Sequence, residues 1–149
     1  MRLLLALIYA TLMHANASAE AHDDRACAPD GIGVGGYDLV SYHHEDGPVA
    51  GVDEFAEQAN GVTYLFRNAQ NLETFRAHPE KYLPTYFGWC ATTLAMGRLT
   101  CPDPINFKIE DGRLLLFELA GFTNGRSLWN ADPVGFKERA DANFMQLVK

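Results

Sequence analysis

Three soft sulfur donors lie close together in the second half of the sequence. Cys90 follows an aromatic-rich stretch, and Met96 and Cys101 come shortly after it. Thiolate and thioether sulfurs favour Cu(I) over harder ions. The spacing therefore predicts a transition-metal site, most plausibly for copper, centred on Cys90 with help from Cys101 or Met96. Two other arrangements stay open: Cys90 as a packed, unreactive thiol, or a Cys90–Cys101 disulfide closing a short loop.

Two adjacent histidines could add a nitrogen ligand to such a site. His43 and His44 fall in or just beyond a segment predicted to be extended, where neighbouring side chains point to opposite faces. One of them, but not both, is therefore a candidate partner for Cys90. The alternative is a solvated polar turn that binds no ion.

The chain begins with the residue order of a cleavable secretory signal. Arg2 is followed by an apolar run over residues 3–13 and by alanines at 15, 17 and 19. The run is about half the length that a membrane-spanning helix needs. We expect removal of residues 1–19, a periplasmic or secreted protein, and no stable membrane insertion after cleavage. The other interpretation is an uncleaved anchor or a buried N-terminal helix.

Cleavage after Ala19 would create a further candidate metal site at the new terminus. His22 would then be the third residue of the chain, after Glu20 and Ala21. A free amine, two backbone amides and an imidazole in this order form a square-planar nitrogen set that suits Cu(II) or Ni(II). Cleavage after Ala17 or Ala21 would remove the arrangement, and chance placement of His22 is the alternative.

Charge and cysteine content limit the classes of partner. Loss of Arg2 takes the basic residues from 12 to 11 against 19 acidic ones, so the formal charge goes from -7 to -8. Nucleic acid is therefore not an expected partner. The three cysteines leave one unpaired in an oxidising compartment, and Cys27 can pair with either of the others.

The sequence predicts one α+β domain over residues 35–149, preceded by a flexible lead over residues 20–34. Alternation predicts extended segments over residues 37–42 and 62–66. Asn68 is a predicted N-cap for a helix from Ala69 to about Ala77, and Pro79 ends it or starts a short second helix through Tyr82. Phe55 is expected in a loop or short helix.

The second half is predicted to hold a hairpin and a final helix. Residues 106–117 form the hairpin with its turn at Asp111-Gly112, and the return strand is apolar on both faces, so it should be central. Asp132 followed by Pro133 is a typical helix start, and apolar residues recur at helical spacing after it.

An ordered set of short motifs points to a family. These are Gly36-Tyr37-Asp38, the strand at 62–66, Phe75 followed by Pro79-Glu80-Lys81-Tyr82, Gly88-Trp89-Cys90-Ala91, and Asp111-Gly112-Arg113-Leu114. From about Gly35 to Asn143 the chain resembles secreted YHS domain-containing proteins of bacteria. The resemblance implies a small α+β module with a metal-related role and a metal ion or metal-handling protein as partner. It supplies no catalytic residues.

The sequence departs from the metal-binding members of that family at two positions. Where many YHS modules carry paired cysteines, this chain has Arg67 and Asn71. A guanidinium group offers no lone pair to a metal. The paired-thiolate site of such relatives is therefore not expected here.

No hydrolase, transferase or nucleotide-binding motif is found, so we do not expect an enzyme. The leading hypothesis is a metal-binding or metal-handling protein. The alternative is a non-catalytic interaction module whose aromatic loop, residues 82–89, docks a partner without any metal.

Overall fold

The computed structural model describes residues 25–148 and has the expected α+β class. Its α-helices are α1 (Ala69–Ala77), α2 (Pro79–Tyr82), α3 (Ala91–Ala95), α4 (Gly125–Ala131) and α5 (Pro133–Leu147). Three antiparallel pairs join β1 (Val52–Ala59) to β2 (Val62–Phe66), β3 (Asp103–Glu110) to β4 (Arg113–Phe117), and β5 (Leu119–Ala120) to β6 (Thr123–Asn124). The 3₁₀ turns are η1 (Pro29–Gly31), η2 (Gly33–Gly36), η3 (Ser41–His43) and η4 (Thr85–Gly88).

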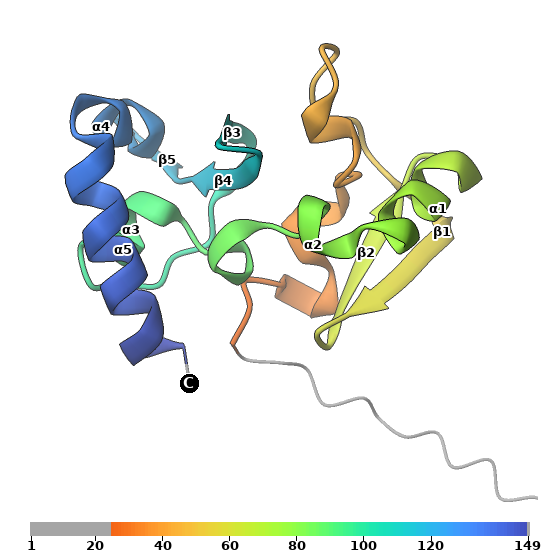
Figure 1. Cartoon of the computed structure of the whole chain (residues 1–149), viewed down its shortest axis with the longest axis horizontal. Helices are drawn as coiled ribbons and strands as arrows, with labels where there is room; N and C mark the ends of the chain where they lie inside the picture. The colour runs from red at the N-terminus through yellow and green to blue at the C-terminus, as the bar shows by residue number, and fades with distance from the viewer. Residues whose placement is uncertain (1–24, 149) are drawn as a thin grey trace, which may run out of the picture.

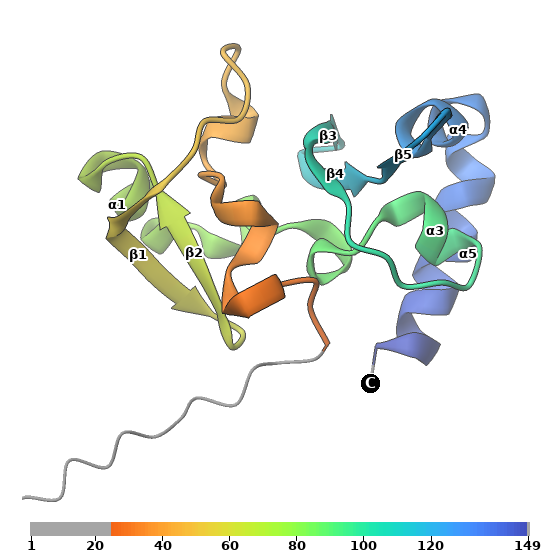
Figure 2. The same cartoon turned by 180° about the vertical axis from the view of Figure 1, so that it is seen from behind.

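The chain forms two halves, each with its own hydrophobic core (Figures 1 and 2). The first core lies among the N-terminal turns, β1, β2, α1 and α2, and its large buried side chains include Leu39, Tyr42, Phe66, Phe75 and Tyr82. The second core lies among α3, α4 and α5 and includes Tyr86, Leu94, Phe117, Trp129 and Ala140.

Strand β4 lies between the two cores and contributes to both. Leu114 and Leu116 pack in the first core, whereas Leu115 and Phe117 pack in the second. Successive side chains of a strand point to opposite faces, so an unbroken apolar run is suited to this position. All four side chains are buried, so the predicted burial of both faces is confirmed, but β4 has β3 as its single strand partner and is not the central strand of a sheet.

The residues before β1 differ from their prediction. Residues 25–34, predicted as part of a flexible lead, place Ala26, Ala28 and Val34 in the first core. Residues 37–42, predicted to be extended, make a single bridge from Tyr37 to Ala50 and then turn into η3. Side-chain oxygens of Asp38 and Ser41 bond nearby backbone groups here, which competes with pairing to another strand.

Two predicted helix starts are confirmed by their capping bonds. The Asn68 side chain accepts a hydrogen bond from the Asn71 N–H at 2.8 Å, and the Asp132 side chain accepts one from the Gly135 N–H at 3.0 Å. Phe55, expected in a loop or short helix, lies in β1. Across the described chain, no helix combines the length and apolar character that crossing a bilayer requires.

Candidate functional site

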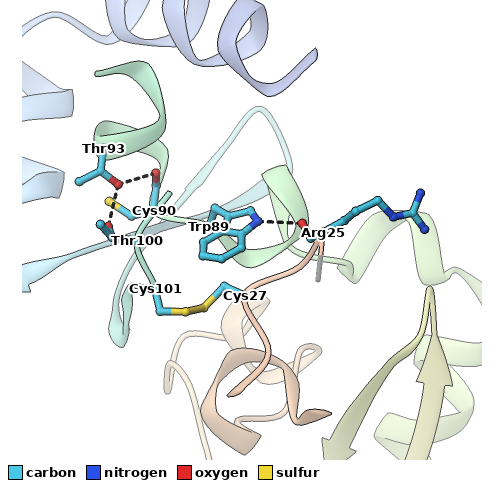
Figure 3. The surroundings of a disulfide bond; sticks show 7 residues. All are labelled: Arg25, Cys27, Trp89, Cys90, Thr93, Thr100 and Cys101. Carbon is cyan, nitrogen blue, oxygen red and sulfur yellow. Dashed lines mark hydrogen bonds between the residues drawn. A yellow bond between two sulfur atoms is a disulfide. The ribbon is translucent and has the colours of Figure 1, made fainter. Parts of the chain in front are cut away.

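A disulfide joins Cys27 to Cys101 across a sequence separation of 74, with the two Cα atoms 5.5 Å apart (Figure 3). The bond ties the residues that enter the first core to the segment that leads into β3. Of the three pairings left open by the sequence, this one leaves Cys90 as the free thiol. Cys101 therefore has no thiolate to offer a metal ion, and its predicted help to Cys90 does not fit this pairing.

Cys90 is a packed residue at the start of α3. Its side chain is 0% exposed, and its sulfur accepts a hydrogen bond from the Glu118 N–H at 3.1 Å. The Cys90 N–H donates to the Thr100 carbonyl at 3.0 Å. Figure 3 shows the side chain directed toward Thr93 and Thr100 rather than toward the disulfide. This geometry matches the unreactive, buried thiol left open as an alternative.

The other predicted ligands do not converge on Cys90. Met96 lies at the far end of α3 and is 49% exposed. His43 contacts α2, and His44 lines a small polar cavity with Arg67 and Asn68. Within residues 25–148, no three His, Cys, Asp or Glu side chains form a group that could hold a metal ion. The described residues therefore do not fit a copper centre built on Cys90.

The candidate site at His22 lies outside the described residues. Its square-planar nitrogen set depends on where the chain is cleaved, so it stays a prediction. N-terminal sequencing of the mature protein tests it, and a first residue other than Glu20 rejects it.

We expect the Cys90 thiol to be unreactive in the folded protein. A thiol-reactive dye should label no cysteine of the unreduced native protein, and one per chain after unfolding, because the sulfur is 0% exposed. Counting labelled thiols by mass spectrometry measures both states. Rapid labelling of the native protein would contradict the buried position, as would a Cu(I) affinity that falls in Cys90→Ser.

His43 lies in a partly buried position that disfavours its charged form. Its Nε2 atom has no hydrogen-bond partner among the described residues, and its ring stands edge-on to Tyr82 with ring centres 5.2 Å apart. Burial lowers the pKa of His43 below its ordinary value of 6.5, and the neighbouring charges of Lys81 and His44 lower it further. Protonation is thus disfavoured in the folded state.

The lowered pKa of His43 predicts a loss of stability at acid pH. The unfolded chain binds a proton at pH values where the folded site still resists it. The contribution is therefore fully present above pH 6.5 and is lost as the pH falls from 6.5 through the lowered folded-state pKa. Urea unfolding across this range should show a shallower pH dependence in His43→Phe, which keeps an aromatic ring against Tyr82. Equal slopes in the two proteins would reject this account.

A buried carboxylate organises the chain beside α1. Asp38 is 0% exposed. One of its oxygens accepts from the Val40 and Ser41 N–H groups at 2.8 and 3.3 Å. The other accepts from the Arg67 N–H at 2.9 Å and the Asn71 amide at 2.7 Å. The Arg67 backbone and the Asn71 side chain thus satisfy one oxygen of Asp38, a role that was not predicted from the sequence.

The aromatic loop, residues 82–89, binds residues 25–27 through hydrogen bonds. The Trp89 indole N–H donates to the Arg25 carbonyl at 2.8 Å (Figure 3). The Cys27 N–H donates to the Phe87 carbonyl at 3.0 Å. Tyr82 and Tyr86 are buried, so half of the loop's aromatic rings belong to the two cores. The loop is therefore a fixed connection between the halves.

The backbone of the aromatic loop is strained at its centre. Tyr86 and Phe87 have φ values of 57° and 52°, in the left-handed region. Each such residue costs about 1–2 kcal/mol when it carries a side chain. The Tyr86 hydroxyl donates to Asp141 Oδ1 at 2.8 Å, and burial together with this carboxylate raises the pKa of Tyr86 above its usual range. Strain of this kind persists only where neighbours fix it, often at sites that bind ligands.

One wall of a surface groove is formed by this strained loop. The groove has a volume of about 330 Å³ and takes its other walls from the turn before β4 and from α5. Lys81, Leu83, Phe87, Arg113 and Phe144 are among its lining residues. We refer to it as the loop groove. Arg113 and Phe144 were not predicted as site residues, because only the fold brings them to the loop.

A second cavity, of about 350 Å³, lies beside the disulfide. It is lined mainly by apolar groups, including Ile32, Val34, Pro102 and Pro104. Asp30 is the charged residue in its lining. It contains none of the histidines or Met96, so it does not gather the predicted ligands either.

Comparison with protein-family models, with curated proteins and with solved structures gives no match for this chain. The resemblance to YHS domain-containing proteins therefore stays a prediction that depends on the motifs in the sequence.

Proposed function

We propose that this protein is a secreted or periplasmic, non-catalytic interaction module that docks a partner protein in the loop groove. The observation that carries the proposal is the strained backbone at Tyr86 and Phe87, fixed at Asp141 on one side and at Cys27 on the other. A fold that holds two aromatic residues in an unfavourable conformation gives the groove a rigid wall. Rigid walls lower the entropy cost of binding.

The composition of the groove supports docking more than metal binding. Leu83, Phe87 and Phe144 provide half-buried apolar surface, and Lys81 and Arg113 provide charge at the edge. Docking surfaces commonly combine an apolar centre with a polar rim. The sulfur atoms predicted to bind copper, in contrast, are enclosed at Cys90 or bonded at Cys101.

Selection from a displayed random peptide library tests the proposal. Peptides selected on the wild-type protein should bind Thr85→Trp at least about tenfold more weakly, because an indole at this lining position obstructs the groove. Thr123→Trp is the matched control, since it adds the same side chain to the exposed strand β6. Binding should be measured by fluorescence polarisation with each folded variant.

Two outcomes would reject docking in the loop groove. One is a selection that enriches no peptide sequence above background. The other is a set of peptides that bind the wild-type protein, Thr85→Trp and Thr123→Trp with equal affinity, because the bound surface would then lie elsewhere.

A further inference from the structure

The loop groove carries two cations without acidic partners. The Lys81 ammonium lies 5.0 Å from the centre of the Tyr82 ring, and the Arg113 guanidinium lies 5.7 Å from the centre of the Tyr86 ring. In the described part of the chain, neither makes an ion pair with a carboxylate within 4.0 Å. Contacts with aromatic faces hold both charges at the edge of the groove while leaving them able to bind an anion.

One carboxylate lines the groove with the two cations, and another lies behind its wall. Glu80 lines the groove, and its Oε1 lies 3.8 Å from Nδ1 of His78, the N-cap residue of α2. Asp141 Oδ1 accepts a hydrogen bond from the Tyr86 hydroxyl at 2.8 Å. The charged residues of the lining are therefore two cations and one carboxylate, a formal charge of +1, although the chain as a whole has a formal charge of -7. This local reversal of sign is a basis for selecting partners.

The lining also contains apolar side chains, and the groove is small. The Phe87 and Phe144 rings meet edge to face with centres 5.3 Å apart, and Leu83 lies beside them in the lining. A volume of about 330 Å³ is at the lower end of the range for ligand sites. It suits one large side chain with its neighbouring peptide groups and is too small for a docked helix.

We propose that the loop groove recognises a short acidic segment of a partner protein, in which one aromatic or large aliphatic residue is flanked by aspartate or glutamate. This inference rests on the proposed docking function and adds the chemistry of the partner. The apolar side chain lies against Phe87 and Phe144, and the flanking carboxylates bind Lys81 and Arg113.

Capped tripeptides test the inference on the full protein. Phenylalanine is placed between two glutamates, two glutamines or two lysines, and a fourth peptide has alanine between two glutamates. Titrations followed by two-dimensional NMR should shift the backbone signals of Phe87, Arg113 and Phe144. We expect the glutamate peptide to bind about tenfold more tightly than the glutamine peptide, and the lysine peptide to bind most weakly. The alanine peptide should bind more weakly than its phenylalanine counterpart.

Two charge-reversal variants and a control locate the effect. Lys81→Glu and Arg113→Glu should each invert the preference between the glutamate and lysine peptides. Arg98→Glu, at an exposed site outside the groove lining, should not. The advantage of the glutamate peptide should also shrink at about 1 M salt, where charges are screened beyond about 3 Å.

The possible failures are distinguishable. Equal shifts with the glutamate and glutamine peptides would overturn the acidic partner and leave docking in the groove intact. The absence of groove shifts with every peptide would overturn both proposals. Groove signals that change on dilution of the protein alone would identify a second copy of the chain as the occupant and overturn the acidic segment.

Discussion

Replacing Asp38 by alanine is expected to lower the free energy of unfolding by about 3–5 kcal/mol. The change removes a fully buried carboxylate that accepts from three backbone N–H groups and one side-chain amide. Each hydrogen bond to a charged group contributes about 1.5–3 kcal/mol, and buried donors left without an acceptor add a further penalty. Water entering the vacated space offsets part of the loss. Urea unfolding followed by tryptophan fluorescence measures the change.

Two further variants serve as controls for the Asp38→Ala measurement. Asp53→Ala removes a carboxylate from an exposed position of β1 and should change stability by less than about 0.5 kcal/mol. Asp38→Asn keeps the shape but presents an amide NH₂ to donors that need an acceptor, so an intermediate loss is expected. A loss in Asp38→Ala no greater than that in Asp53→Ala would mean that the carboxylate does not hold η3, β2 and α1 together.

Loss of the disulfide is expected to cost about 4 kcal/mol. The bond closes a loop with a sequence separation of 74, and the chain-entropy account of disulfides gives about this value for a loop of such length. Domains of this kind have a total stability of about 5–15 kcal/mol. The variant to measure is Cys27→Ser with Cys101→Ser, because either change alone leaves a thiol free to pair elsewhere.

The reduced wild-type protein is the matched control for that double variant. If the covalent bond is the cause, reduced wild type and double variant should unfold at the same urea concentration, both well below the oxidised protein. A double variant that is destabilised by less than about 1 kcal/mol would show that the packing of Ala26 and Ala28 holds these residues without the bond.

Local signals in the sequence predicted local structure well. Asn68 and Asp132 were predicted as helix caps, and both make the expected capping bond, because a cap needs only residues close in sequence. The apolar run of the return strand in the 106–117 hairpin predicts burial on both faces, and β4 is buried on both faces between the two cores, although its sheet has only two strands. The short helix α3 and strand β1 were not predicted.

Features that depend on contacts between distant residues could not be predicted from local sequence patterns. The choice of Cys101 over Cys90 as partner of Cys27 depends on which residues the fold brings together. The loop groove depends on Tyr86 and Phe87 adopting a left-handed backbone that aromatic residues rarely take. No local pattern signals that conformation, since it is maintained by Asp141 and Cys27 from elsewhere in the chain.

The position of β4 also determines how the protein unfolds. Leu114 and Leu116 pack in one core, and Leu115 and Phe117 pack in the other. If either half unfolds, it exposes one face of β4 and removes packing that the other half requires. Amide hydrogens of Tyr64 in β2 and Leu94 in α3 should therefore exchange with solvent through the same global opening. The two halves should behave as a single cooperative unit, despite their separate interiors.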